Sequence, residues 1–491
     1  MPNPLPTWSK SVGTLLSHPG DQPPQHQVSL TVNDGVIQAI APAETSDHPD
    51  WLALPALANA HDHGRGVAPF VFGALDQALE LWLPSLKLSP PIPSYESAAL
   101  AMARMARGGV GSVMHCHNPA SPNVMEEMLQ VCQAARDVGV RLGLAVSMND
   151  RNSLSYGHAD RLLNLLPESD RSAVEQLWNQ PPRSPQAQLQ LVDDLAATCS
   201  DDDRITIQYG PRGPQWCSPE LLEAIAEASA NTGRRVHMHV LETRYQREWA
   251  DTHYPQGVIT YLDEIGLLSP RLTIAHGIWL KPAEMELLAE RGVIVSVNTS
   301  SNLRLRSGLA PYRQLVQAGV PTALGLDGMA INDDDDALKE LRLNYHLHAE
   351  VGIEQSLTLS HLFRSHRYGA TVVTHRQDIG TLEPGMAADI LMLNRAALMA
   401  DVVPDLCDEA ALVMARGAAR YVDSLYVAGR PVVAAGQVVG IDEEAIAADV
   451  RHALTHPPDR VYSLQPLVQR YQSALTQFYG QGWHQKHSDN A

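Results

Sequence analysis

Two histidines one residue apart, His61 and His63, follow the mostly apolar run 54–60 and precede two glycines, Gly64 and Gly66. The run is typical of a buried strand, and the glycines indicate a sharp exit loop. Because side chains i and i+2 of a strand face the same side, we expect both imidazoles to project together. Two converging imidazoles make half of a metal site, although such a pair also occurs as ordinary polar residues at a strand end. The rest of the chain decides between these interpretations.

Further residues that can bind a metal or carry a proton lie at or just after the ends of later β-rich runs: His239, Glu242, His276 and Asp327. With the first pair, His239 and Asp327 complete a set of three histidines and one aspartate that suits Zn²⁺ or Fe²⁺. Glu242 and His276 are then titratable groups beside a metal-bound water molecule. The combination is far more specific than any one of its members.

The runs that carry these residues alternate with helical stretches through the middle of the chain. After the strand that ends at His61, the pattern predicts further strands at residues 111–117, 141–147, 204–210, 235–240, 272–276, 293–297 and 322–327. Eight such units favour a (β/α)8 TIM-like barrel over residues 56–380, where strand ends converge on one mouth. A doubly wound open sheet is the alternative, but no Gly-x-Gly-x-x-Gly phosphate loop follows any of these strands.

The two ends of the chain read differently from the middle. Residues 1–26 are rich in proline and predict a loop, while runs 28–32 and 36–40 around Asp34-Gly35 predict a hairpin that needs a partner sheet. Short β-rich runs with glycine turns return at residues 389–393, 424–433 and 437–440. We therefore expect a small discontinuous β-sandwich built from residues 1–55 and 381–455. Residues 456–491 predict a helical tail, with its helix near 464–478 and a frayed end.

The amino-acid composition excludes several classes of binding partner and cellular compartment. The formal net charge of −19 over 491 residues argues against a nucleic-acid or acidic-membrane partner and favours solubility. No run approaches the roughly 18 apolar residues of a membrane span. The N-terminus lacks a basic region followed by an apolar core, so no secretory signal is expected. The five scattered cysteines form no Cys-x-x-Cys pair, which fits a reducing cytoplasm and argues against a disulfide framework or a zinc ribbon.

Taken together, these motifs resemble the amidohydrolase superfamily, and within it the cytosine-deaminase and triazine-hydrolase branch. The resemblance covers residues 28–440 in the family's order. It rests on His61-Asp-His63, His239-Val-Leu-Glu242-Thr, Ala275-His276, Ser300-Ser-Asn302 with the residues up to 308, Leu326-Asp327-Gly328 and residues 379–389. It implies a barrel, a β-sandwich from both chain ends and hydrolysis by metal-activated water.

Carried over residue by residue, the resemblance makes His61, His63, His239 and Asp327 metal ligands. It implies that Glu242 shuttles a proton to the substrate nitrogen, that His276 polarises the water or the developing oxyanion, and that Asp327 accepts the water's proton. Family members with two bridged metals usually carry a carboxylated lysine on the fourth strand, and residues 205–210 contain none. This favours one divalent metal per chain, Zn²⁺ first, with Fe²⁺ or Mn²⁺ also compatible. His237 lies one layer deeper than His239, and we leave it outside the ligand set.

Candidate substrate contacts lie on the loops after the strands: Arg65, His117, Trp216, Asn302 and Arg304. Arg65 could bind an anionic or carbonyl-rich substrate, or it could be structural. Trp216 could stack on a planar ring or pack locally. His117 and its neighbour His115 could reach substrate or orient another group. The family's usual histidine before the Ser-Asn pair is replaced here by Asn298-Thr299, so no substrate contact is carried over to that place.

The acidic run 333–336 predicts a solvated helix start and not a second metal site.

The expected function is deamination of a small N-heterocycle, such as a purine, pyrimidine, pterin or triazine-like ring. Two alternatives stay open: hydrolysis of an amide or cyclic ureide by the same residues, and a non-catalytic scaffold. A small-molecule substrate is the expected partner, and a homo-oligomer is implied by the family alone.

Overall fold

The computed structural model describes residues 6–119, 121–403 and 406–485. Its centre is a barrel of eight parallel strands in sequential order, each hydrogen-bonded to the next. The strands are β5 (Leu57–Asp62), β6 (Val110–His117), β7 (Arg141–Met148), β8 (Ile205–Pro211), β9 (Val236–Val240), β10 (Leu272–His276), β11 (Ile294–Val297) and β12 (Thr322–Leu324). Just beyond β12, the Asp327 amide donates to the His61 carbonyl at 2.9 Å, which brings the last strand against the first. The predicted (β/α)8 barrel is confirmed.

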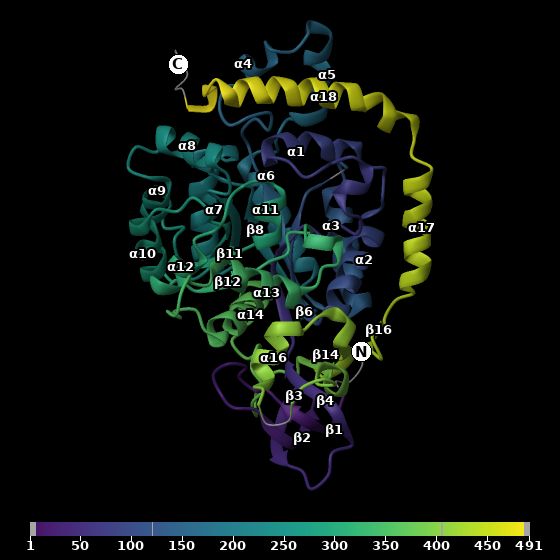
Figure 1. The fold of residues 1–491 in the computed structure, drawn as a ribbon. Helices are drawn as coiled ribbons and strands as arrows, with labels where there is room; N and C mark the ends of the chain where they lie inside the picture. Colours follow the sequence, from purple (N-terminus) through teal and green to yellow (C-terminus); the bar gives the residue numbers. More distant parts are fainter. Residues whose placement is uncertain (1–5, 120, 404–405, 486–491) are drawn as a thin grey trace.

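Helices surround the barrel strands (Figure 1). They are α1 (Leu79–Ser85), α2 (Ser94–Arg107), α3 (Val124–Val138), α4 (Ala159–Leu163), α5 (Glu168–Trp178), α6 (Pro185–Thr198), α7 (Pro219–Thr232), α8 (Arg244–His253), α9 (Val258–Glu264), α10 (Pro282–Glu290), α11 (Thr299–Arg304), α12 (Tyr312–Gln317), α13 (Ala337–His348) and α14 (Leu359–Thr374). Because helices cover the outside and side chains fill the inside, the strands are buried on both faces, as parallel strands usually are. Every residue of β5 and β6 is buried.

A second sheet lies beyond one end of the barrel (Figure 1). Its strands are β1 (Trp8–Leu15), β2 (Gln25–Asn33), β3 (Val36–Pro42), β4 (His48–Pro55), β13 (Ile390–Asn394), β14 (Val422–Val427), β15 (Arg430–Ala434) and β16 (Gln437–Val438). They form one continuous mixed sheet in the order β16-β15-β14-β13-β4-β1-β2-β3. The antiparallel pairing of β4 with β13 joins the two chain ends, which confirms that both ends build the second domain.

The prediction of a loop over residues 1–26 was wrong for β1. This strand pairs antiparallel with β2, and its inward residues Val12 and Leu15 are fully buried. The strand has no regular alternation of apolar and polar residues, since Ser11 and Thr14 are buried as well, and the nearby prolines favoured a loop. The strand β4 was also missed, because its first half is polar and its second half merges with the apolar run that leads into β5. The proposed domain boundaries at residues 55, 380 and 455 stay predictions.

The tail forms two helices, α17 (Glu443–Thr455) and α18 (Asp459–Gly480), so the predicted helix is present and longer than expected. In Figure 1, α17 runs along the outside of the barrel and α18 crosses beside α1 and α5 at the end away from the second sheet. The Tyr471 hydroxyl donates to the Leu154 carbonyl at 2.8 Å, and the Tyr156 amide donates to the Tyr479 hydroxyl at 3.2 Å. These bonds fix α18 to the segment that follows β7. The frayed end predicted for the last residues lies mostly outside the described residues.

Asp336 caps α13, as the acidic run predicted, by accepting from the amides of Leu338 and Lys339. The expected solvation was wrong for Asp335 and Asp336, which are buried, and Asp335 pairs with Arg104 at 2.9 Å. Among the described residues, no helix is both long and apolar enough to cross a membrane.

Candidate active site

The four predicted metal ligands meet at the carboxyl end of the barrel strands. The Nε2 atoms of His61 and His63 each lie 3.3 Å from Asp327 Oδ1. His239 Nε2, at the end of β9, lies 3.4 Å from His63 Nε2. Asp62, between the two histidines, accepts from the amides of Gly64 at 2.7 Å and Gly328 at 2.9 Å, which ties the end of β5 to the loop after β12.

In His61, His63 and Asp327, the ring nitrogen or carboxylate oxygen that faces away from the centre of the group already has a hydrogen-bond partner. The atoms that face the centre remain available to bind an ion. His63 Nδ1 donates to the Cys116 carbonyl at 2.9 Å, and His61 Nδ1 lies 2.8 Å from His237 Nε2. Ser301 donates to Asp327 Oδ2 at 2.6 Å. His61 Nε2 and Asp327 Oδ1 are buried and have no hydrogen-bond partner within the described residues. A buried unpaired acceptor is costly, so the set fits a divalent cation.

The electrostatics agree with this fit. Burial lowers the pKa of His63 and His239 well below 6.5, and it lowers the pKa of His61 although the Asp327 carboxylate opposes that shift, so the imidazoles are neutral. Burial alone would raise the pKa of the Asp327 carboxyl, but the facing imidazoles outweigh it and hold that pKa well below 3.8. Neutral imidazoles and an ionised carboxylate are the protonation states that metal binding requires.

His237 lies behind His61, on the side away from Asp327, in agreement with its exclusion from the ligand set. Together with Cys116 and His61 it forms a second group of possible ligand atoms within 4.8 Å of one another. Burial raises the pKa of the Cys116 thiol well above 9.0, which keeps it protonated and makes it a poor ligand. We therefore interpret His237 as the group that orients His61.

Glu242 and His276 face each other beside this set. Glu242 Oε2 lies 3.8 Å from His276 Nε2, and both side chains are buried. Burial raises the pKa of the Glu242 carboxyl to about 7, although His276 alone would lower it. A carboxyl group with this pKa can both take up and release a proton near neutrality. His276 Nδ1 lies 2.9 Å from Asn302 Oδ1, so Asn302 holds the ring with Nε2 towards Glu242.

Two of these residues adopt a strained backbone. His276 has φ 73° and Asp327 has φ 58°, in the left-handed region that non-glycine residues rarely adopt. Strain of this kind persists where the surrounding structure enforces it, and it gathers at functional sites.

A buried carboxylate supports the segment that carries Ser301 and Asn302. Glu340, in α13, accepts from the amide of Ser300 at 2.9 Å and from its hydroxyl. Burial raises the pKa of Glu340 from 4.5 to about 7. The folded state therefore binds more protons than the unfolded state between these pH values, so stability falls as pH rises through this window.

We expect Glu340→Gln to remove this decrease in stability with rising pH. From pH 5 to pH 8, the free energy of unfolding of the original protein should decrease relative to that of the variant, by up to about 3 kcal/mol. Urea unfolding at several pH values measures the free energy of unfolding of both proteins. Parallel pH curves for the two proteins would contradict the role of Glu340.

The structure places the predicted substrate contacts as follows. Arg65 donates to the Asp327 carbonyl at 2.6 Å and lies over the Trp82 ring at 5.0 Å, which favours its structural interpretation. Arg304 pairs with Asp76 at 3.1 Å and with Asp333 at 2.6 Å.

The other three contacts also have partners. His117 lies 3.0 Å from Glu127. Asn302 contacts His276, as described above, and Trp216 packs edge-on against Tyr156 at 5.6 Å. Each of the five side chains therefore already has a protein partner, and their roles towards substrate stay predictions.

Two charged residues near Trp216 were missed. Arg212 directly follows β8 and lies over the Trp216 ring at 5.2 Å, and in the part of the chain that is described its guanidinium makes no ion pair or hydrogen bond. Its position after a predicted strand could have revealed it. Glu80, in α1, accepts from Thr243 at 2.5 Å and from Tyr156 at 3.0 Å, while its Oε2 atom is buried and unpaired. No motif marks Glu80.

Comparison with known proteins agrees with the fold. The amidohydrolase family model matches residues 52–432. A 5-methylthioadenosine/S-adenosylhomocysteine deaminase from Pelotomaculum thermopropionicum is 28% identical, covering 86% of this chain and 90% of that protein. An 8-oxoguanine deaminase from Pseudomonas aeruginosa is 30% identical, covering 82% and 86%. The solved structure of an adenosine deaminase from Xanthomonas campestris with bound zinc has a TM-score of 0.73 and 24% identity, covering 93% of this chain and 98% of that one.

The family match spans most of the chain, and both relatives are covered over more than two thirds of their length. The chain belongs to the amidohydrolase family, in its deaminase branch, and is a metal-dependent hydrolase of carbon–nitrogen bonds other than peptide bonds.

Proposed function

We propose that the protein deaminates an amino-substituted N-heterocycle of purine type, with one metal ion held by His61, His63, His239 and Asp327. The observation that carries this proposal is the buried Glu242–His276 pair beside the proposed ligands, in which His61 Nε2 and Asp327 Oδ1 are buried and have no hydrogen-bond partner among the described residues. Both relatives described above act, by name, on purine compounds, which supports the substrate class. Zn²⁺ suits the donors best, and Fe²⁺ is the alternative.

When bound, the metal would lower the pKa of a water molecule and so supply a nucleophile near neutral pH. Asp327 would accept the proton of that water. Glu242 moves a proton to the amino nitrogen, and His276 Nε2 stabilises the charge that develops on oxygen. Water adds to the ring carbon, the C–N bond breaks, and ammonia leaves with the transferred proton. The aminated carbon thus becomes a carbonyl carbon.

The region around Arg212 supports a more specific substrate. An unpaired guanidinium that lies half-buried over an aromatic ring is costly unless something binds it. We place the substrate's exocyclic carbonyl or acidic group against Arg212. Burial lowers the pKa of Arg212 from 12.5, and an arginine remains charged at neutral pH regardless.

A panel of heterocycles tests the function. We expect ammonia release from at least one aminated ring among 5'-methylthioadenosine, 8-oxoguanine, cytosine and melamine. If that ring is 8-oxoguanine or cytosine, which carry an exocyclic carbonyl, Arg212→Met should raise its KM about tenfold or more, since a hydrogen bond to a charged group contributes about 1.5–3 kcal/mol. Arg420→Met, on the exposed surface of the second domain, is the matched control.

Ring opening of a cyclic ureide such as dihydrouracil, without ammonia release from any aminated ring, would replace this proposal with the amide-hydrolase alternative.

We also propose that the protein is cytoplasmic and that it forms a homo-oligomer. The first rests on the free cysteines, and the second on the family alone. Size-exclusion chromatography with light scattering tests the second.

A further inference from the structure

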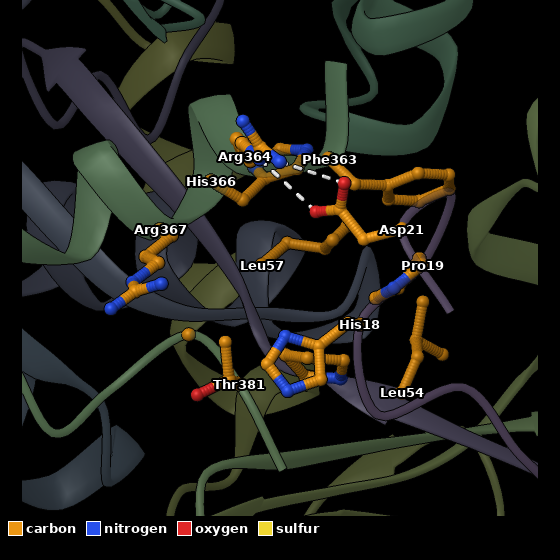
Figure 2. A pocket seen from close by; sticks show the side chains of 12 residues that line it. His18, Pro19, Asp21, Leu54, Leu57, Phe363, Arg364, His366, Arg367 and Thr381 are labelled. Atoms are coloured by element: carbon orange, nitrogen blue, oxygen red, sulfur yellow. Dashed lines mark hydrogen bonds and ion pairs between the residues drawn. The ribbon is translucent and has the colours of Figure 1, made fainter. Parts of the chain in front are cut away.

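A hollow with about 460 Å³ of atom-free space, including its opening, lies where β4 turns into β5 and meets α14 (Figure 2). Leu54 and Pro55 come from the end of β4, and Leu57 begins β5, so the hollow is next to the strand end opposite His61. It is therefore separate from the metal ligands. Leu54, Leu57 and Phe363 give it an apolar wall.

Positive charge gathers around this wall, although the chain as a whole is acidic. This charge comes from Arg364 and Arg367, and Asp21 is the one acidic residue of the lining. His18 and His366 also line the hollow, but burial lowers the pKa of His366 to about 4, so its ring is neutral. Figure 2 shows Arg364 turned towards Asp21, and its guanidinium donates to that carboxylate at 2.7 and 3.0 Å. His18 pairs with Glu383 at 3.0 Å. Arg367, in contrast, is exposed at the rim of the hollow, and its side chain makes no ion pair or hydrogen bond with any residue that the structure describes, so its guanidinium is free to bind a ligand.

Two buried polar atoms of the lining also lack partners. Thr381 Oγ1 and His366 Nε2 have no hydrogen-bond partner among the described residues, and both residues are more than nine-tenths buried. His366 Nδ1 lies 3.1 Å from the Ala58 carbonyl, which fixes the ring. Gly380 lets the Thr381 segment approach Arg367, since a Cβ at Gly380 would lie 2.9 Å from Arg367 Cα. Leaving a buried hydroxyl unpaired is costly, and a bound ligand that accepts from the Thr381 hydroxyl would satisfy it.

From this combination of an unpaired arginine, orphaned polar atoms and an apolar wall, we propose that the hollow binds a small organic carboxylate with an apolar group. The carboxylate pairs with the Arg367 fork and accepts from the Thr381 hydroxyl, while the apolar group packs on Leu57 and Phe363. A dianion such as phosphate fits less well, because Asp21 and Glu383 stand close and only one arginine is free.

Titration of the metal-loaded enzyme with 4-fluorobenzoate, followed by ¹⁹F NMR, tests the proposal. We expect saturable binding that Arg367→Ala weakens by about tenfold or more, because a charge-assisted hydrogen bond is lost. Thr381→Val should weaken it less. Arg451→Ala, on an exposed face of α17, should leave it unchanged. The neutral 4-fluorobenzamide should bind more weakly than the acid, and inorganic phosphate should not displace the acid.

A crystal soaked with 4-bromobenzoate should show bromine in the hollow. Absence of saturable binding, equal binding by Arg367→Ala, equal binding of the benzamide, displacement by phosphate, or bromine at the metal ligands alone would each overturn the proposal. Because every readout is binding, its failure leaves the proposed deaminase function untouched.

Discussion

Replacing Glu242 by glutamine is expected to leave the metal in place and to remove most of the turnover. Glutamine keeps the size and the hydrogen-bonding oxygen of the side chain but cannot carry a proton between water and the amino nitrogen. Proton transfer by a positioned side chain contributes about 10²–10⁴-fold, so kcat should fall by that factor. Steady-state ammonia release on a substrate identified from the panel measures the loss, and elemental analysis measures the metal.

The separation of these two readouts makes the experiment decisive. Glu242 lies in the loop after β9 and contacts His276, so its loss should not open the ligand set. Glu286→Gln, on the exposed side of α10, should keep both activity and metal. Full activity in Glu242→Gln would refute the proton-shuttle role. Loss of metal together with activity would instead show that Glu242 helps to bind the metal or to position its ligands.

The barrel and its ligands were accessible to sequence reasoning for a physical reason. Parallel strands that are buried on both faces read as continuous apolar runs, and a polar residue at the end of such a run stands out. His61, His63, His239 and Asp327 all occupy such ends, and the barrel topology alone brings these ends together. The sequence therefore predicted their proximity without any knowledge of contacts.

Side-chain partners from distant segments were not accessible in this way. For example, the sequence does not show that Arg304 pairs with Asp76 and Asp333, which are far from it along the chain or in another loop. Likewise, nothing in the pattern shows that Asn302 contacts His276. Such pairings depend on loop geometry, which carries no periodicity. Arg212 is a different case, because it lies just after a predicted strand and could have been found there.

The fourth strand supports the proposal of one metal per chain. Residues 205–210 of β8 contain no lysine, and Gln208 within them is fully buried and donates to the Val372 carbonyl at 2.7 Å. This strand therefore offers no ligand that could bridge two ions. We expect elemental analysis to give about one Zn or Fe per chain, and about two would contradict the single-metal proposal and move the function towards cyclic-amide hydrolysis.

His239→Ala is expected to lose this metal and all measurable turnover. His239 is the only proposed ligand from β9, and its removal leaves a hole where an imidazole would bind the ion. Because an ion that binds only the folded state stabilises it, the metal-loaded protein should unfold at a higher temperature than the chelated protein. The variant should unfold close to the chelated protein whether or not Zn²⁺ is added. His456→Ala, exposed at the end of α17, should respond to Zn²⁺ like the original protein. If His239→Ala instead keeps one metal and its zinc-dependent stability, the proposed ligand set is wrong. If neither the original protein nor the variant binds metal after growth with added Zn or Fe, the non-catalytic scaffold replaces the deaminase as the proposed function.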